Sequence, residues 1–251
     1  MYRATEATWP PLQAVPAGPW TLREGAGGGK RVSAATQHAT LDADVDVPAA
    51  EDAMRIMGQE PLFMIREGDN DLDAALARRG YGVVDPVNLW LCPVAALTDR
   101  PVPPVMAFSI WEPLAIMREI WAEGDVGPER VQVMERARGP KTALLGRLND
   151  KPAGVGYCAL DDSVAMVHAL HVRPDSRNAG LGGWMMRAAA HWAADWNATW
   201  MSVICTQSNA SANWLYMSLG MELAGRYHYR VLRTDTPSDT IPDPTPDITQ
   251  E

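Results

Sequence analysis

The stretch RPDSRNAGLGGWMMRAAAHWAADW, residues 173–196, decides the fold of this chain. Its glycines at 180, 182 and 183 stand directly ahead of a segment rich in Trp, Met and Ala, a composition typical of a helix. Glycine has no Cβ, so it permits turns and close approaches that other residues block. The first N–H groups of a helix lack partners and carry the positive end of its dipole. The stretch therefore indicates either a plain helix start or a helix N-terminus that binds a phosphate.

The segments around this stretch alternate between strand and helix patterns. Residues 163–172 form a strand pattern that runs directly into the glycines. Upstream we expect two helices and then a hairpin of two strands, at 109–124, 128–138, 141–150 and 151–162. Downstream we expect a strand, a helix closed by Gly220 and a last strand, at 199–207, 209–220 and 225–233.

Two other glycine-loop motifs do not fit residues 173–196. A dinucleotide-binding loop needs a third glycine at a set distance and an acidic residue about twenty positions later for the ribose. The strand that follows here, residues 199–207, contains no Asp or Glu. A Walker loop needs Gly-Lys-Ser/Thr, and no Lys stands near these glycines. Both motifs are excluded by their own requirements.

The first hundred residues predict a separate set of elements. Strands at 20–24 and 31–37 form a hairpin around a turn that contains Gly25 and Gly27 to Gly29. Because a polar alternating segment follows these glycines, we interpret them as a flexible turn and not as a phosphate loop. Beyond the hairpin we expect a helix, a strand, a helix and a strand, at 46–59, 61–67, 69–81 and 87–94.

Prolines at 93, 101, 103 and 104 predict a linker and a domain boundary near residue 100. The division is an N-terminal domain at 1–100, a linker at 101–106 and a second domain at 107–232. Residues 233–251 are rich in Pro, Asp and Thr with almost no large apolar side chains, which predicts a disordered tail.

The order of elements in residues 107–232, together with four short motifs, resembles the GNAT superfamily of acyl-CoA-dependent N-acetyltransferases. The central motif is Arg-x-x-Gly-x-Gly, here Arg177 to Gly182. A strand ending in Leu-x-Val precedes it, here Leu170-His171-Val172, and an Asn follows it, here Asn209. The fourth motif is Leu-Tyr-x-x-x-Gly, residues 215–220. The resemblance implies an α/β (α+β) fold with a mixed, mostly antiparallel central sheet flanked by helices.

The resemblance also implies acetyl-CoA as cosubstrate and gives the glycines a physical role. Side chains at 180 and 182 would keep the pyrophosphate of acetyl-CoA away from the helix N–H groups, and glycine lets it in. Arg177 would add positive charge, and the strand ending at Val172 would polarise the thioester carbonyl through its N–H groups. The implied binding residues are Leu170, His171, Val172, Arg177, Asn178, Ala179, Gly180, Leu181, Gly182, Gly183 and Asn209.

Tyr216 stands at the family's position for the acid that protonates the departing thiolate of CoA. A phenol with a pKa of about 10 can give a proton to a thiolate whose thiol has a pKa of about 8.5 without being ionised at pH 7. The alternative for Tyr216 is ordinary core packing. Asn209 has two interpretations as well, a hydrogen bond to the pantetheine arm or a cap on its own helix.

The base that deprotonates the acceptor amine is the least defined part of the site. His168 has a suitable pKa, and strict strand alternation places it on the face of Leu170 and Val172, opposite His171. The two histidines should then be unable to share a metal, and we expect no metal at the site. The alternatives are that His168 is a buried, hydrogen-bonded core residue, that Glu222 is the base, or that a base acts through water.

Composition limits the partners of the chain. A net charge of −9 over 251 residues, with a pI near 5, argues against a nucleic-acid binder and favours a cationic or amine-bearing partner. Three distant cysteines, Cys92, Cys158 and Cys205, indicate neither a disulfide framework nor a zinc site. No signal peptide or membrane-spanning pattern is found, so we expect a soluble cytoplasmic protein. The oligomeric state is left open.

The sequence thus predicts an acyltransferase that moves an acetyl group from acetyl-CoA to a primary amine by direct attack in a ternary complex. The acceptor, a small molecule, a lysine or a protein N-terminus, is left open. The alternative is a non-catalytic CoA-binding sensor or scaffold. Residues 64–94 parallel residues 202–232, with Asp69 opposite Asn209 and Leu76 opposite Tyr216. The N-terminal half is therefore interpreted as a degenerate GNAT-like unit that walls the acceptor pocket.

Overall fold

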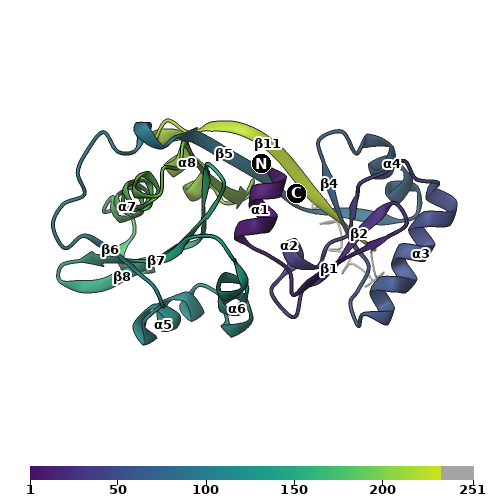
Figure 1. Cartoon of the computed structure of the whole chain (residues 1–251), viewed down its shortest axis with the longest axis horizontal. Helices are drawn as coiled ribbons and strands as arrows, with labels where there is room; N and C mark the ends of the chain where they lie inside the picture. Colours follow the sequence, from purple (N-terminus) through teal and green to yellow (C-terminus); the bar gives the residue numbers. More distant parts are fainter. Residues whose placement is uncertain (233–251) are drawn as a thin grey trace, which may run out of the picture.

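The computed structural model describes residues 1–232 as a mixed α/β protein with two sheets (Figure 1). The helices are α1 (Tyr2–Thr8), α2 (Lys30–Ser33), α3 (Ala43–Ile56), α4 (Asn70–Arg78), α5 (Ala115–Glu123), α6 (Pro128–Arg136), α7 (Leu181–Asp195) and α8 (Ala210–Ser218). The strands are β1 (Gln13–Ala17), β2 (Trp20–Glu24), β3 (Thr36–Gln37), β4 (Leu62–Arg66), β5 (Tyr81–Pro93), β6 (Ala107–Ile110), β7 (Lys141–Leu148), β8 (Lys151–Asp161), β9 (Val164–Val172), β10 (Trp200–Thr206) and β11 (Glu222–Leu232). Short 3₁₀ turns occupy Val94–Ala96 and Pro174–Ser176. The predicted tail at 233–251 lies outside the described residues.

The larger sheet has eight strands in the order β4-β11-β5-β10-β9-β8-β7-β6, and the smaller has the order β1-β2-β3. Within the described residues, β9 and β10 are the one parallel pair of named strands, and the other neighbours run antiparallel. The mixed, mostly antiparallel sheet flanked by helices confirms the predicted fold class.

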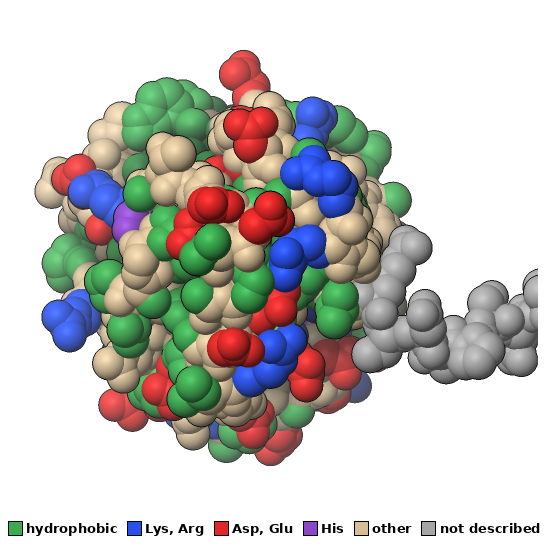
Figure 2. Space-filling model, turned by 90° about the vertical axis from the view of Figure 1, so that its right-hand side faces the viewer, with side chains coloured by type: hydrophobic (Ala, Val, Ile, Leu, Met, Phe, Trp, Pro, Cys, Tyr) green, Lys and Arg blue, Asp and Glu red, His purple; other side chains and the backbone are tan. Residues whose placement is uncertain are grey.

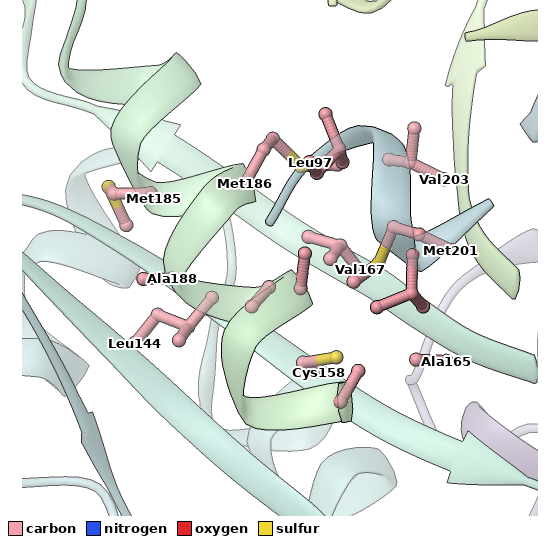
Figure 3. Packing of buried hydrophobic residues seen from close by; sticks show 14 of the residues in the cluster. Leu97, Leu144, Cys158, Ala165, Val167, Met185, Met186, Ala188, Met201 and Val203 are labelled. Atoms are coloured by element: carbon pink, nitrogen blue, oxygen red, sulfur yellow. The ribbon is translucent and has the colours of Figure 1, made fainter. Parts of the chain in front are cut away.

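Two apolar layers cover the part of the sheet formed by β7, β8 and β9. On one face, α7 buries Met185, Met186 and a row of alanines against Leu144, Val167 and Met201 (Figure 3). On the other face, α5 and α6 pack Trp121 and Met134 around Tyr157. Alanines on α7 have small side chains, so the helix lies close to the sheet and holds the glycine stretch at the end of β9.

The last strand of each half crosses to the other half of the molecule (Figure 1). β5 pairs with β10, and β11 pairs with β4, while β5 and β11 pair with each other at the centre. The units β4-α4-β5 and β10-α8-β11 therefore occupy equivalent places around the β5–β11 seam. A small apolar cluster closes this seam and includes Met64, Leu89, Tyr227 and Tyr229.

Two local predictions differ from the structure, and two elements were not predicted. Residues 107–110 form strand β6 and not the start of a helix, because α5 begins only after Pro113, which disfavours a helical conformation in the residue before it. Residues 30–33 form the short helix α2 and not a strand, since fully buried Val32 packs into the cluster around Trp121. The N-terminal helix α1 and strand β1 were not predicted, because neither carries a clear periodic pattern.

Candidate active site

The parallel strands β9 and β10 separate before they end. Their pairing stops at Val167 and Val203, yet β9 continues to Val172 and β10 to Thr206. A cavity of about 460 Å³ opens at this point, between the two strands and the start of α8. Its wall contains Leu170, His171, Asn209 and Tyr216 from the predicted site and also Trp9, Gly28, Gly29, Lys30 and Arg31 from the N-terminal half.

A β-bulge distorts β9 where it borders this cavity. His168 pairs with Tyr157 and His171 pairs with Val155, so two residues of β9, Ala169 and Leu170, lie opposite one residue of β8. Ala169 has a φ of 48°, a left-handed conformation that is unfavourable for alanine. The Trp121 indole N–H donates to the Ala169 carbonyl oxygen at 2.9 Å and holds the bulge in place.

The bulge corrects the predicted placement of the two histidines. Because Tyr157 and Val155 are two residues apart on β8, their partners His168 and His171 lie on the same face of β9 and not on opposite faces. Leu170 and Val172 pack into the apolar layer on the other side, under α7. Strict alternation failed here because it cannot include the extra residue of a bulge. Within residues 1–232, no group of three or more His, Cys, Asp or Glu could hold a metal.

His168 is buried and hydrogen-bonded at both ring nitrogens. Arg31 Nη1 donates to Nδ1 at 3.0 Å, because a guanidinium has no acceptor atom, and Nε2 therefore donates to Thr8 Oγ1 at 2.8 Å. The Thr8 hydroxyl in turn donates to the Ala4 carbonyl oxygen at 2.7 Å. Burial, with the Arg31 charge beside it, holds the pKa of His168 well below its usual range. His168 is thus a neutral imidazole without an open lone pair.

His171 lines the cavity with its imidazole against the end of α5. A Cβ built on Gly124 would lie only 2.4 Å from His171 Nδ1, so this position needs glycine. His171 Nε2 is shielded from solvent and has no hydrogen-bond partner among the described residues. Burial lowers the pKa of His171, and the charge of Arg177 lowers it further.

The glycine stretch forms the N-terminus of α7 immediately after β9. Gly180 is the N-cap residue with a φ of 78°, which favours glycine. Within residues 1–232, none of the backbone N–H groups of 178–183 has a hydrogen-bond acceptor. A Cβ on Gly182 would come within 3.1 Å of Leu215 Cδ2 on α8, so close helix packing also favours glycine there. Six unpaired N–H groups at the positive end of a fifteen-residue helix suit an anionic group.

Arg177 is exposed at the start of this loop, and its Nε donates to the Val172 carbonyl oxygen at 3.1 Å. This contact fixes the loop to the end of β9. The loop 178–183 is thus adjacent to the strand that borders the cavity, although its residues do not line the cavity itself.

Tyr216 is buried and lines the cavity from α8. Its hydroxyl has no hydrogen-bond partner within the described residues. Burial, with a smaller contribution from nearby Cys205, raises the pKa of Tyr216 above its usual value. The phenol therefore keeps its proton at neutral pH and is free to donate it.

Asn209 caps α8, because its side-chain oxygen accepts from the Ala212 N–H at 3.0 Å. It also lines the cavity. A residue that the sequence did not indicate, Asn213, fixes the same helix. Asn213 Oδ1 accepts from Asn88 Nδ2 at 2.8 Å and from Trp90 Nε1 at 3.1 Å, which ties α8 to β5. No sequence signal could identify this role, because it depends on β5 lying beside β10.

Residues 110–221 match the model of the acetyltransferase (GNAT) family. A GCN5-related N-acetyltransferase from Kribbella flavida superposes with a TM-score of 0.70 at 18% identity, over 95% of this chain and 96% of that one. A conserved protein of unknown function from Staphylococcus epidermidis gives a TM-score of 0.65 at 10% identity, covering 90% of this chain and 96% of that one. A tandem GNAT protein from the clavulanic acid biosynthesis pathway gives a TM-score of 0.58 at 14% identity, covering 88% of this chain and 84% of that one.

At these identities the solved structures show a shared fold alone. No protein of curated function matches the chain in sequence. The family model covers residues 110–221, somewhat less than half of the chain; in this region the chain is similar to the GNAT acetyltransferases, which transfer an acyl group from an acyl-CoA. In addition, no helix within residues 1–232 has the length and hydropathy needed to cross a membrane.

Proposed function

We propose that this protein transfers an acetyl group from acetyl-CoA to the primary amine of an acceptor, by direct attack while both substrates are bound. The observation that carries this proposal is the cavity between β9 and β10, which has a β-bulge on one wall and the free Tyr216 hydroxyl on another. The pyrophosphate of acetyl-CoA would bind the unpaired N–H groups of 178–183, and Arg177 would add positive charge. The pantetheine arm would pass Asn209 between the separated strands.

The bulge supplies the electrostatic part of the proposed mechanism. The extra residue of a bulge is left out of the strand ladder, so an N–H group at Ala169 or Leu170 can face the thioester carbonyl. As the amine nitrogen attacks the carbonyl carbon, negative charge builds on the carbonyl oxygen. A fixed backbone donor stabilises that charge without reorganising. Trp121 is a positioning residue here, since it holds the Ala169 carbonyl.

Tyr216 is the proposed general acid. When the carbon–sulfur bond breaks, the sulfur leaves with the electron pair and takes the Tyr216 hydroxyl proton. The amine loses a proton to water in the cavity, which can then restore the phenol. We assign this step to water because His168 is hydrogen-bonded at both nitrogens and His171 Nε2 is shielded. His168 instead positions Arg31 and α1.

The test is amine-dependent release of CoA thiol by the wild type and by Tyr216→Phe. The wild type should release thiol only when an acceptor amine from a panel is present. Tyr216→Phe keeps the ring packing and removes the proton, so kcat should fall by roughly 10²- to 10⁴-fold with little change in KM for acetyl-CoA. If Tyr216→Phe keeps full turnover, Tyr216 serves in core packing and not as the acid. Tight acetyl-CoA binding without thiol release in the presence of any amine would instead favour the alternative, a non-catalytic CoA-binding sensor.

A further inference from the structure

The cavity wall differs in charge from the rest of the molecule. The chain carries a net charge of −9, and acidic and basic side chains are mixed over the outer end that carries α3 and α4 (Figure 2). Of the charged side chains that line the cavity, Lys30, Arg31 and Arg130 are cationic and only Asp85 is anionic. The cavity is therefore locally positive in an acidic protein.

Two of these three cations are engaged within the protein. Lys30 Nζ forms an ion pair with Asp85 Oδ2 at 2.9 Å. Arg130 Nη1 donates to the Asp125 carbonyl oxygen at 2.9 Å, and its guanidinium lies at the rim beside Gly29. Lys30 therefore has a counter-ion, and Arg130, which has none among the described residues, is partly exposed to water.

Arg31 is different. Among the described residues, no carboxylate lies within 4.0 Å of its guanidinium. Nη1 donates to neutral His168, the guanidinium carbon lies 5.7 Å from the centre of the Trp9 ring, and Nε is shielded from solvent without a partner. A cation held away from water without a counter-ion is destabilising. A bound carboxylate would offset this cost, because it accepts two parallel N–H bonds from a guanidinium.

The surroundings of Arg31 suit a carboxylate. Burial lowers the pKa of the Arg31 guanidinium, but the neighbouring phenols of Tyr227 and Tyr229 outweigh this effect and raise the pKa; both phenols line the cavity. Burial raises the pKa of Tyr229 well above its usual value, so this phenol stays neutral and can donate a hydrogen bond. Arg31 also contacts the side chain of His168, the residue that directly precedes the bulge. An anion on Arg31 would thus lie close to the proposed acyl-transfer point.

From this geometry we propose that Arg31 binds the carboxylate of the acceptor, and that the acceptor is an amino carboxylate such as a free amino acid. The proposal rests on the function proposed above. A carboxylate could also enter the cavity on the acyl group, as in a dicarboxylic acyl-CoA, so the experiment separates these two sources. An acceptor without an anion, such as a polyamine, would leave Arg31 with neutral partners alone, His168 and the two phenols.

The experiment compares amino acids with their amides, pairs that differ only in the carboxylate. The wild type should use the amino acid with the higher kcat/KM. Arg31→Met should lower kcat/KM for the amino acid by roughly 10- to 100-fold and leave the amide nearly unchanged, since hydrogen bonds to charged groups contribute on this scale. Arg31→Lys keeps the charge and should restore part of the preference. The control is Arg55→Met, which removes an exposed arginine of α3 that pairs with Asp52. It should leave kcat/KM unchanged for both the amino acid and the amide.

Three outcomes would overturn the proposal. One is a wild type that shows no preference for the carboxylate. The second is an Arg31→Met variant in which kcat/KM falls equally for the amino acid and the amide, which would give Arg31 a structural role only. The third is a preference for succinyl-CoA over acetyl-CoA that depends on Arg31 and occurs with the amides, which would place the carboxylate on the acyl group.

A binding measurement keeps this test separate from the proposed function. Calorimetric titration of amino acid or amide into the protein saturated with CoA needs no turnover. If no amine releases thiol but the amino acid still binds more tightly than its amide through Arg31, the acyl-transfer function fails and the carboxylate site stands. If thiol is released equally from both members of each pair and neither binds preferentially, the acyl-transfer function stands and the carboxylate site fails.

Discussion

The imidazole of His168 is held neutral where α1, α2 and β9 meet. Its two hydrogen bonds, to Arg31 and Thr8, require that Nδ1 accepts and Nε2 donates. A proton on Nδ1 would break the bond from Arg31 and place two positive charges together. His168, which the sequence indicated as a candidate base, therefore links the two halves of the chain through these hydrogen bonds.

This arrangement predicts a pH dependence of stability. The pKa of His168 lies well below 6.5 in the folded chain and near 6.5 when unfolded, so the unfolded state binds the proton more readily. The stabilisation is complete above about pH 6.5 and is lost as the pH falls toward the folded pKa. The melting temperature of the wild type should fall between about pH 7 and pH 5.

His168→Gln is the matched variant, because an amide oxygen can still accept from Arg31 but does not take up a proton in this range. Its melting temperature should depend less on pH over the same interval. The partly buried His171, whose pKa is also lowered, accounts for the dependence that remains. Identical pH profiles for variant and wild type would contradict the neutral, buried imidazole.

The first turn of α7 is the element on which cosubstrate binding depends. Gly183 is the third residue of this helix, and a Cβ there would lie 3.9 Å from Leu215 Cδ1, an ordinary contact. An acidic side chain at this position favours the helix by about 0.3–1 kcal/mol through the helix dipole. The same negative charge would repel a pyrophosphate on the loop N–H groups. Stability and cosubstrate affinity should therefore change in opposite directions.

Gly183→Asp should keep or raise the melting temperature while weakening acetyl-CoA binding by roughly tenfold or more, since like charges about 4 Å apart near a protein surface repel by a few kcal/mol. Gly183→Asn adds nearly the same volume without the charge and should weaken binding much less. Calorimetric Kd values for both variants check this. Equal losses from Asp and Asn would mean that volume rather than charge matters.

Most elements of the second half could be predicted from sequence because each carries its own pattern. The hairpin of β7 and β8 turns at Asn149 and Asp150, both with positive φ, as Asn and Asp permit. The helix α8 ends at Ser218, and Gly220 two residues later has the left-handed conformation that commonly closes a helix. The bulge at Ala169 could not be predicted, because it depends on pairing with β8 and on the hydrogen bond from Trp121. The predicted roles of loop 178–183 and Tyr216 still await the experiments above.

The exchange of β5 and β11 is the main feature of the whole molecule that local patterns could not predict. Sequence indicates where a strand begins and ends, whereas the choice of neighbour depends on the complete sheet. The exchange brings residues from the first hundred positions, Trp9 and Arg31 among them, to a cavity bordered by the second half. Net charge has a similar limit, since the −9 of the chain does not describe the charge of the cavity wall.

The units β4-α4-β5 and β10-α8-β11 are equivalent in topology but not in chemistry. Asp69 begins α4 as Asn209 begins α8, but the Asp69 carboxylate accepts from the N–H and the guanidinium of Arg66. Leu76 is fully buried in the N-terminal core at the position that corresponds to Tyr216. The N-terminal half also has no Arg-x-x-Gly-x-Gly loop. We therefore propose that it is a degenerate GNAT-like unit whose role is to complete the cavity wall.

The most direct test of this account is a calorimetric titration of the intact chain with acetyl-CoA. We predict one binding site per chain, strongly weakened by Gly183→Asp, because the unpaired N–H groups of 178–183 belong to the second half alone. Two equivalent sites per chain, or a single site that keeps its affinity in Gly183→Asp, would contradict the placement of the acyl-CoA site at the N-terminus of α7.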